Sequence, residues 1–272
     1  MNSIMNYFEF VVVVLVYRNT SDLLDFFENF RLQNSKVIVV NSFHDTESED
    51  SFANIAMNYN ADFISVQNKG YGVGNNRGIE FAMIHYKFEY IIISNADITI
   101  RNFNFETLNP KVVTAPKIIT KSGRNQSPSS PFAPGRWFAD IKRWCFEGNH
   151  NRLLYVAYAY NRLTKILFYT LSPFRKKVFS AHGAFFIMPQ WVVEKVAPLY
   201  NEKMFLFNEE EHLGKKLQLY GIRTEYNPHI IVDHKEDGSV SLLNTKLFAL
   251  ERASYLEYYR FWYIDKDYMK QW

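Results

Sequence analysis

The sequence YIIISNADITI, residues Tyr90–Ile100, begins with an apolar run that stops at Asn95 and Asp97. A short run of this kind predicts a buried β-strand, which would leave Asp97 at the exposed C-terminal end of that strand. In an α/β sheet, ligands bind beyond this end of the strands. A turn in which Asn95 and Asp97 bind the backbone is also compatible with these residues alone.

The segment before Tyr90 alternates between predicted strands and helices. Short apolar runs predict three more strands, at residues 11–16, 36–41 and 61–67. Candidate N-cap residues at 19–22 start one helix, and another helix precedes the Tyr90 strand. The apolar stripes of these helices are Leu23, Phe26, Phe27 and Phe30, and Ile79, Ala82, Met83 and Tyr86. This alternation favours right-handed crossovers and a doubly wound, mainly parallel sheet, so the expected fold class is α/β.

Polar residues follow all four predicted strands. Because the carboxyl ends of parallel strands meet at one edge of a sheet, these residues should lie together. They are Tyr17-Arg18-Asn19, Asn41-Ser42, Gln67-Asn68 and Asn95-Ala96-Asp97.

The stretch NKGYGVGNNRGIEFA, residues 68–82, places four glycines between the third strand and a helix. Small residues and the free N–H groups of a helix N-terminus suit an anion such as a nucleotide phosphate. The spacing matches neither the dinucleotide-binding motif nor the phosphate loop. A flexible turn that caps the helix explains the glycines as well as a binding loop does.

The composition limits the class of protein. The chain has 272 residues, of which 47% are apolar, enough for one large α/β domain with or without a smaller appendage. Cys145 is the single cysteine, which excludes an internal disulfide framework and favours a reducing, cytoplasmic compartment. The net charge of +3 gives no reason to expect a nucleic-acid partner. The apolar stretches are too short for a membrane span, and no basic segment precedes the first of them, so we expect no secretion signal.

Seven ordered motifs together resemble a known family. They are VVVVLVYRN, VIVVNS, NKGYGVGNNRGI, IIISNADI, HGAFFIMP, FLFNEEEHLGKKLQLYG and VDH. Over residues 9–235 they are similar in order and spacing to bacterial family 2 glycosyltransferases, inverting enzymes with the GT-A fold. The closest resemblance is to members that build capsule, O-antigen or other cell-surface polysaccharides, including rhamnosyltransferase-like ones. It implies a GT-A domain over residues 1–240, divided into a nucleotide-sugar half (1–110) and an acceptor half (111–240), and a C-terminal helical extension at 241–272.

The resemblance implies transfer of a sugar from a UDP- or dTDP-sugar, with Mn²⁺ or Mg²⁺ stabilising the diphosphate leaving group. Asp97 would hold the cation, and His234 would either complete its shell or contact phosphate or the protein. The family commonly has Asp-x-Asp here, whereas this chain has Asn95, a neutral and weaker ligand. The residues that match donor-binding positions are Tyr17, Asn19, Asn41, Asn68, Gly70, Asn76, Arg77 and Asn95.

The resemblance also aligns Glu209 and Glu210 with the family's acidic pair, whose second member is the general base. Carboxylates are equally expected in a first helical turn, where they oppose the helix dipole. Gly183, with His182 beside it, matches small residues that let the acceptor sugar approach. His212 stands where relatives have a further aspartate, and the resemblance implies that it contacts the acceptor together with His182 and Gly183. We expect Asp97 and Glu210 to face each other across one cleft.

Between Glu147 and Glu194 the chain has no acidic residue, while basic and aromatic residues alternate. This composition favours an interfacial helical segment that contacts anionic lipid and reaches a saccharide acceptor linked to polyprenyl diphosphate. An aromatic core hairpin with a solvated basic edge is the alternative. The aromatic C-terminus could pack on the domain, pair with a second chain in a homodimer, or contact lipid. Residues 124–136, rich in Ser and Pro, are expected to form a mobile loop over the acceptor side.

Other functions remain compatible with the sequence. A carbohydrate- or nucleotide-binding module that kept the fold and lost catalysis would explain Asn95 and His212. A nucleotidyltransferase shares a similar nucleotide-binding half, but it normally has a Gly-rich basic loop after the first strand, where this chain reads YRNTSD. An NAD-dependent oxidoreductase would show the dinucleotide fingerprint that is absent here.

Overall fold

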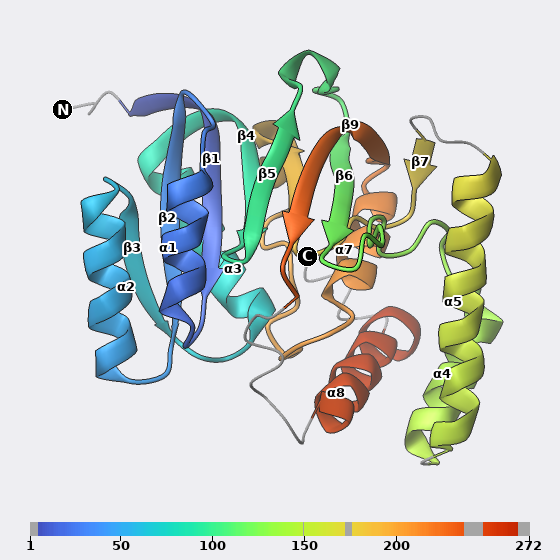
Figure 1. Cartoon of the computed structure of the whole chain (residues 1–272). Coiled ribbons are helices and arrows are strands. Elements are labelled where there is room, and N and C mark those ends of the chain that lie inside the picture. Colours follow the sequence, from blue (N-terminus) through green and yellow to red (C-terminus); the bar gives the residue numbers. More distant parts are fainter. Residues whose placement is uncertain (1–4, 149, 172–175, 237–246, 266–272) are drawn as a thin grey trace.

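The computed structural model describes residues 5–148, 150–171, 176–236 and 247–265. These residues form a mixed sheet of nine strands with helices packed on both faces (Figure 1). The strand order is β3-β2-β1-β4-β8-β6-β9-β5, and β7 pairs with β9. The strands are β1 Asn6–Val16, β2 Ser35–Phe43, β3 Asp62–Gln67, β4 Tyr86–Asn95, β5 Ile98–Phe103, β6 Val113–Thr120, β7 Lys176–Val178, β8 Phe185–Pro189 and β9 Thr224–His234. The helices are α1 Thr20–Asn29, α2 Thr46–Asn58, α3 Tyr71–His85, α4 Arg136–Glu147, α5 Asn151–Leu171, α6 Gln190–Val196, α7 Glu209–Leu219 and α8 Leu247–Tyr259.

The first four strands confirm the predicted α/β class. β1 pairs in parallel with β2 and β4, and β2 pairs in parallel with β3. Along β1, Val11 and Val13 belong to the core under α3, whereas Val12 and Val14 belong to the core under α1 and α2. A strand covered on both faces needs an apolar residue at every position, which explains the continuous valine run.

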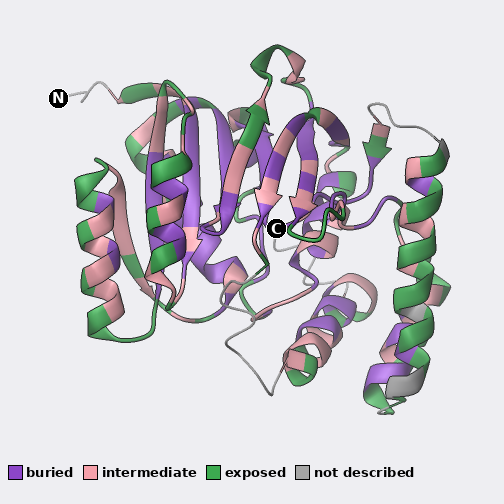
Figure 2. Ribbon diagram, in the orientation of Figure 1, coloured by how far each residue is buried: buried purple, intermediate pink, exposed green. Residues whose placement is uncertain are grey.

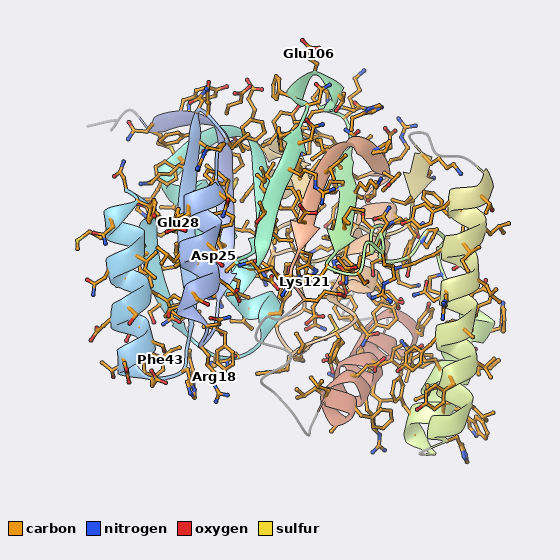
Figure 3. The ribbon with its side chains drawn as sticks, in the orientation of Figure 1. Arg18, Asp25, Glu28, Phe43, Glu106 and Lys121 are labelled. Carbon is orange, nitrogen blue, oxygen red and sulfur yellow. The ribbon has the colours of Figure 1, made fainter. Side chains whose placement is uncertain are left out.

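The second half of the sheet is mixed. β8 runs antiparallel to β4 and β6, β9 runs parallel to β6, and β5 runs antiparallel to β9. Helices α6 and α7 cover the same face as α3. In Figure 3, Arg18 and Phe43 lie together at the edge where β1 and β2 end, whereas Glu106, after β5, lies at the opposite edge.

Helices α4, α5 and α8 lie beside the sheet and share a smaller aromatic core (Figure 1). Phe146 of α4, Leu154 of α5 and Tyr255 of α8 are buried in it. The helical segment predicted after Glu147 is therefore present as α5, and part of the expected C-terminal extension is α8. Residues 241–246 and 266–272 of that extension lie outside the described residues.

Two local features differ from the prediction. Helix α2 was not predicted, because Phe52 and Ala56 are its only buried residues and leave almost no apolar stripe. Tyr86, assigned to a helical stripe, begins β4. In the loop at 124–136, isolated bridges link Asn125 to β6 and residue 130 to residue 180. No described helix is both long and apolar enough to cross a membrane.

Candidate active site

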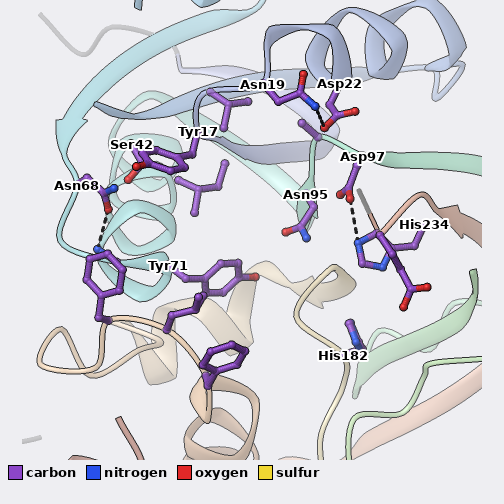
Figure 4. Close-up of a pocket in the computed structure, with 18 of the residues that line it drawn as sticks. Tyr17, Asn19, Asp22, Ser42, Asn68, Tyr71, Asn95, Asp97, His182 and His234 are labelled. Carbon is purple, nitrogen blue, oxygen red and sulfur yellow. Dashed lines mark hydrogen bonds and ion pairs between the residues drawn. The ribbon is translucent and has the colours of Figure 1, made fainter. Parts of the chain in front are cut away.

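A cavity of about 440 Å³ opens at the carboxyl ends of β1 to β4 (Figure 4). We call it the first cavity. The parallel strands bring their polar ends to this one edge, as the sequence predicts. Eight predicted site residues line it: Tyr17, Asn19, Asn68, Gly70, Asn95, Asp97, His182 and His234.

Gly70 allows the loop after β3 to touch the far wall of this cavity. Its φ is +108°, and a Cβ at this position would lie 2.2 Å from the carbonyl oxygen of Phe205. That carbonyl accepts a hydrogen bond of 2.8 Å from the N–H of Tyr71. Only glycine fits such a backbone contact, so this part of the glycine-rich stretch serves to close the cavity.

Asp97 and His234 form a buried pair in the first cavity. The Nε2 atom of His234 lies 3.2 Å from Oδ2 of Asp97, and Nδ1 lies 2.7 Å from Oε1 of Gln126. Gln126 donates its amide N–H to Glu236, which orients its oxygen toward His234. Nδ1 therefore carries a hydrogen that it donates to Gln126, and Nε2 is the ring nitrogen that faces Asp97. This geometry is that of a His–Asp ion pair, and the same two side chains, with the other ring nitrogen held by a hydrogen bond, are able to bind a metal ion together.

The pair offers two protein ligands. Among the described residues, no group of three or more His, Cys, Asp or Glu side chains is arranged to hold a metal ion. Asn95 also lines the cavity, but its amide oxygen is neutral. A cation held here would need further ligands from a bound anion, because Mg²⁺ and Mn²⁺ favour about six.

Asp22, in the first turn of α1, is a second carboxylate of the first cavity. It accepts a hydrogen bond of 2.6 Å from Asn19 and lies 3.7 Å from Nζ of Lys235. Burial and the nearby Asp97 raise the pKa of Asp22, and Lys235 opposes this. The sequence indicated Asp22 only as a helix-cap candidate.

A second cavity, of about 280 Å³, lies between α4, α5 and the N-terminus of α7. Glu210 lines it together with Phe138 of α4 and Tyr158 of α5. Phe207 lines both cavities. The expectation of one cleft between Asp97 and Glu210 is therefore corrected, because the two carboxylates line adjoining cavities.

Gly183 lies where the two cavities adjoin. Its N–H donates a hydrogen bond of 3.2 Å to Oε1 of Glu210, and its carbonyl accepts one of 2.7 Å from the hydroxyl of Tyr71. Tyr71 lines the first cavity and Glu210 lines the second. A Cβ at Gly183 would lie 3.2 Å from the Glu210 oxygen and 3.3 Å from the Tyr71 oxygen. A larger residue would therefore press on both side chains.

The two glutamates at the start of α7 have unusual acidities. Burial, followed by the charge of Glu210, raises the pKa of Glu209 to about 8, and one of its buried oxygens has no hydrogen-bond partner among the described residues. Burial also raises the pKa of Glu210, while its own backbone N–H and that of Gly183 oppose the rise. At neutral pH Glu209 is therefore a neutral acid that leaves Glu210 without an adjacent buried charge.

Lys165 reaches this site from α5. Its Nζ donates a hydrogen bond of 3.0 Å to the carbonyl of Gln126. Burial lowers the pKa of Lys165 to about 8, and the charge of Glu210 opposes the decrease. Burial, and then the charge of His234, lowers the pKa of His182 to about 3, so this ring is neutral. Lys165 is thus a cation whose charge acts on Glu210.

Phe207 and Asn208 precede these glutamates in a left-handed backbone conformation, with φ of +76° and +68°. Each non-glycine residue in this region costs roughly 1–3 kcal/mol, and such residues cluster at functional sites. The conformation directs Phe207 to the junction of the cavities and starts α7 at Glu209.

The sequence matches no protein-family model, and the search of curated proteins found no match. Among solved structures, GalNAc-T7 in complex with UDP, GalNAc and Mn²⁺ is similar, with a TM-score of 0.55 and 13% identity over 86% of this chain and 44% of that chain. The chain has the GT-A fold. S. aureus TarS is also similar, with a TM-score of 0.52 and 13% identity over 84% of this chain and 36% of that one. The chain thus spans less than half the length of either GT-A neighbour.

Asn41, expected to bind the donor, does not line the first cavity, and its neighbour Ser42 does. Asn41 is fully buried and donates a hydrogen bond of 3.1 Å to the hydroxyl of Ser65, whereas Ser42 lines the first cavity. Successive side chains of a strand point to opposite faces, so the last polar pair of β2 can present only one of its members to the cavity.

Asn76 and Arg77 also lie outside both cavities of this GT-A fold. The Asn76 amide donates to the carbonyl of Tyr200 at 3.0 Å and accepts from its N–H at 3.1 Å. Arg77 pairs with Glu202 at 3.0 Å on the surface. Both residues hold the segment around Tyr200 against α3, which corrects the expectation that they contact the donor.

His212 does not reach either cavity. Its Nδ1 accepts a hydrogen bond of 3.1 Å from the indole of Trp262, and its ring packs against Phe261. Burial lowers the pKa of His212 to about 3, so the ring is neutral. The expectation that His212 contacts the acceptor is therefore corrected, because His212 instead holds the segment that follows α8 against α7.

Proposed function

We propose that the protein transfers a sugar from a nucleoside-diphosphate sugar to a saccharide acceptor. The observation that carries this proposal is the position of Glu210 at the junction of two cavities, one with a buried Asp97–His234 pair and the other with aromatic walls. A transfer between two substrates needs two adjoining pockets and a proton acceptor between them. The GT-A fold is consistent with this reaction.

The first cavity suits the donor. Tyr17, Asn19 and Asn68 line it and would offer an aromatic face and amide groups to a base and a ribose. The diphosphate would lie beside Asp97 and His234, which are the residues that would hold Mn²⁺ or Mg²⁺. A bound divalent cation would stabilise the negative charge of the leaving diphosphate as a Lewis acid. With Asn95 in place of a second aspartate, we expect cation and nucleotide to bind together.

The second cavity suits a saccharide. Phe132, Phe138 and Tyr160 provide aromatic walls, and Glu210, Glu211 and Glu251 provide oxygen atoms for hydroxyl groups. Such a mixture of apolar walls and a few directed polar groups is typical of small-molecule sites. An acceptor in this cavity would present a hydroxyl to Glu210.

Glu210 would act as the general base. Its carboxylate takes the proton of the acceptor hydroxyl as that oxygen forms a bond to the anomeric carbon, and the bond from this carbon to the diphosphate oxygen breaks. A single displacement of this kind inverts the anomeric carbon. The raised pKa of Glu210 makes it a stronger base than an ordinary glutamate.

The finer assignment is to a hexosyltransferase of family 2 that takes a UDP- or dTDP-sugar and builds bacterial surface polysaccharide, such as capsule or O-antigen, on a lipid-linked acceptor. It rests on the seven motifs quoted above and on the exposed aromatic residues of α5, which lines the acceptor cavity. A GT-A module that binds nucleotide without catalysis is the second candidate, and the neutral Asn95 favours it.

Thermal unfolding with nucleotides tests the donor site. UDP and dTDP are added separately, each with and without Mn²⁺. The proposal predicts that one of them raises the melting temperature more with Mn²⁺ than without it, because a ligand of the folded state stabilises that state. If neither nucleotide raised the melting temperature, the proposed donor site would be contradicted. If a nucleotide raised it but no corresponding sugar nucleotide supported sugar transfer, the non-catalytic nucleotide-binding module would be favoured.

A further inference from the structure

Helix α5 turns an apolar face away from the rest of the molecule. Leu154 and Phe168 are 1% and 2% exposed and face inward. Val156, Leu163 and Leu167 are 66%, 64% and 50% exposed, and their spacing puts them on the opposite side of the helix. Figure 2 shows most of α5 as exposed, at the edge of the molecule away from the sheet.

Helix α4, which packs beside α5, adds a second exposed stripe. Trp137, Ile141 and Trp144 recur at spacings of four and three and are 61%, 49% and 51% exposed. Clusters of exposed apolar side chains on a folded protein often mark an interaction site. Tryptophan in particular is enriched at the interface between lipid and water.

The charge of the segment indicates what covers this surface. From Gly148 to Val193 the chain has six lysine and arginine residues and no aspartate or glutamate. Arg162 and Lys177 are exposed among the described residues of this segment. Arg162 lies on the flank of the exposed α5 face, and an apolar face with a basic edge complements an anionic bilayer.

We propose that the outer faces of α4 and α5 bind an anionic lipid bilayer. The helices would lie in the interface with their exposed apolar side chains among the acyl chains and the basic side chains at the headgroups. The opposite side of α5 lines the second cavity through Tyr158 and Thr164. On the proposed function, this arrangement would bring a lipid-anchored saccharide to Glu210, but the lipid binding itself does not depend on sugar transfer.

Sedimentation with vesicles tests the proposal on the full chain. Vesicles of phosphatidylcholine alone are compared with vesicles that also contain phosphatidylglycerol. The variants Val156→Glu and Leu163→Glu place a negative charge on the outer face of α5. Met57→Glu is the matched control, since Met57 is 70% exposed on α2 at the other side of the molecule (Figure 1). Thermal unfolding with and without UDP and Mn²⁺, in the absence of lipid, reports folding and the donor site separately.

We expect the unaltered chain to bind the phosphatidylglycerol vesicles and to bind phosphatidylcholine much less. Each α5 variant should lose about ten-fold or more in vesicle affinity, because a carboxylate adds repulsion and removes apolar contact. Met57→Glu should bind as the unaltered chain does. Absence of binding, equal binding to both vesicles, or unchanged binding of the α5 variants would overturn the proposal. So would a dimer in lipid-free solution that Leu163→Glu dissociates, because a second copy would then cover this face.

Discussion

Oε1 of Glu210 accepts a hydrogen bond of 3.2 Å from the backbone N–H of Gly183. The bond holds the carboxylate beside the junction of the two cavities and stabilises its ionised form, which burial would otherwise disfavour. The carbonyl of the same glycine accepts from Tyr71, a residue of the first cavity. One backbone unit therefore orients a side chain of each proposed substrate site.

Replacing Gly183 with alanine should displace this arrangement. The added methyl group would stand 3.2 Å from the Glu210 oxygen, closer than ordinary van der Waals contact, so the carboxylate must shift by a few tenths of an ångström. Since misplacement of about 1 Å can cost 100-fold in rate, we expect the turnover number for sugar transfer to fall roughly ten-fold. Stabilisation by nucleotide should fall less than turnover, because, beyond the adjoining residues of the chain, two of the three atoms nearest to the methyl group belong to Glu210, and the third is the hydroxyl oxygen of Tyr71 in the first cavity, at 3.3 Å. Unaltered turnover in Gly183→Ala would show that the position of Glu210 at this hydrogen bond is unimportant.

Asp97→Asn should remove the dependence of nucleotide binding on the cation. At a ligand concentration of 100 times Kd, a ligand stabilises the fold by about 2.7 kcal/mol, which corresponds to a melting shift of several degrees. The variant should lose most of the part of this shift that requires Mn²⁺, because an amide is a weaker ligand than a carboxylate.

Asp233→Asn is the matched control for this experiment. Asp233 precedes His234 on β9 and pairs with Arg101 at the surface, outside both cavities. It should keep the full Mn²⁺-dependent shift. If both variants behaved like the unaltered protein, Asp97 would not hold a cation.

Glu209→Gln should change how stability depends on pH. The folded state raises the pKa of Glu209 from its ordinary value of 4.5 to about 8, so it favours the protonated form. The stability that this group contributes is complete below pH 4.5 and is lost as the pH rises to about 8. Glutamine stays neutral at every pH. The free energy of unfolding of the variant, relative to that of the unaltered protein, should therefore rise by about 1.4 kcal/mol per pH unit between these two values. Above about pH 8 this difference should stay constant. Urea unfolding from pH 4 to pH 9 measures this, and parallel stability curves would show that Glu209 ionises normally.

Much of the fold was predictable because local patterns determined it. The valine run of β1 and the isoleucine run of β4 are buried on both faces, and no other element type explains such short continuous runs. Helix α2 was not predicted, because only Phe52 and Ala56 of it are buried and its sequence lacks a clear period of apolar residues. Tertiary contacts stabilise this helix.

Most predicted residues that reach the first cavity lie at or just after strand ends. Asp97 and Asn19 stand at strand ends and reach the first cavity, whereas Asn41 is turned inward by the alternation of β2. Gln126 and Lys165 carry no local signal, since a loop and a helix far along the chain bring them to the site. Side-chain direction and long-range packing decide such positions, and a single sequence contains neither directly.

The acidic limb of the pH profile should also report Glu210. Because burial raises its pKa, the base becomes deprotonated only above the usual range of a glutamate. Turnover should therefore rise with pH through that raised value. A profile that is flat from pH 4 upward would exclude a buried glutamate as the base.

Sugar transfer by Glu210→Gln tests the central claim most directly. Glutamine keeps the size of the side chain but cannot accept the proton of the acceptor hydroxyl, so turnover should fall by roughly 10²- to 10⁴-fold. Nucleotide-induced stabilisation should remain, because Glu210 does not line the first cavity. Glu211→Gln, at the next position of the second cavity, should change acceptor affinity without a comparable loss of turnover. Turnover of Glu210→Gln at the level of the unaltered protein, with the fold and nucleotide binding intact, would contradict the account.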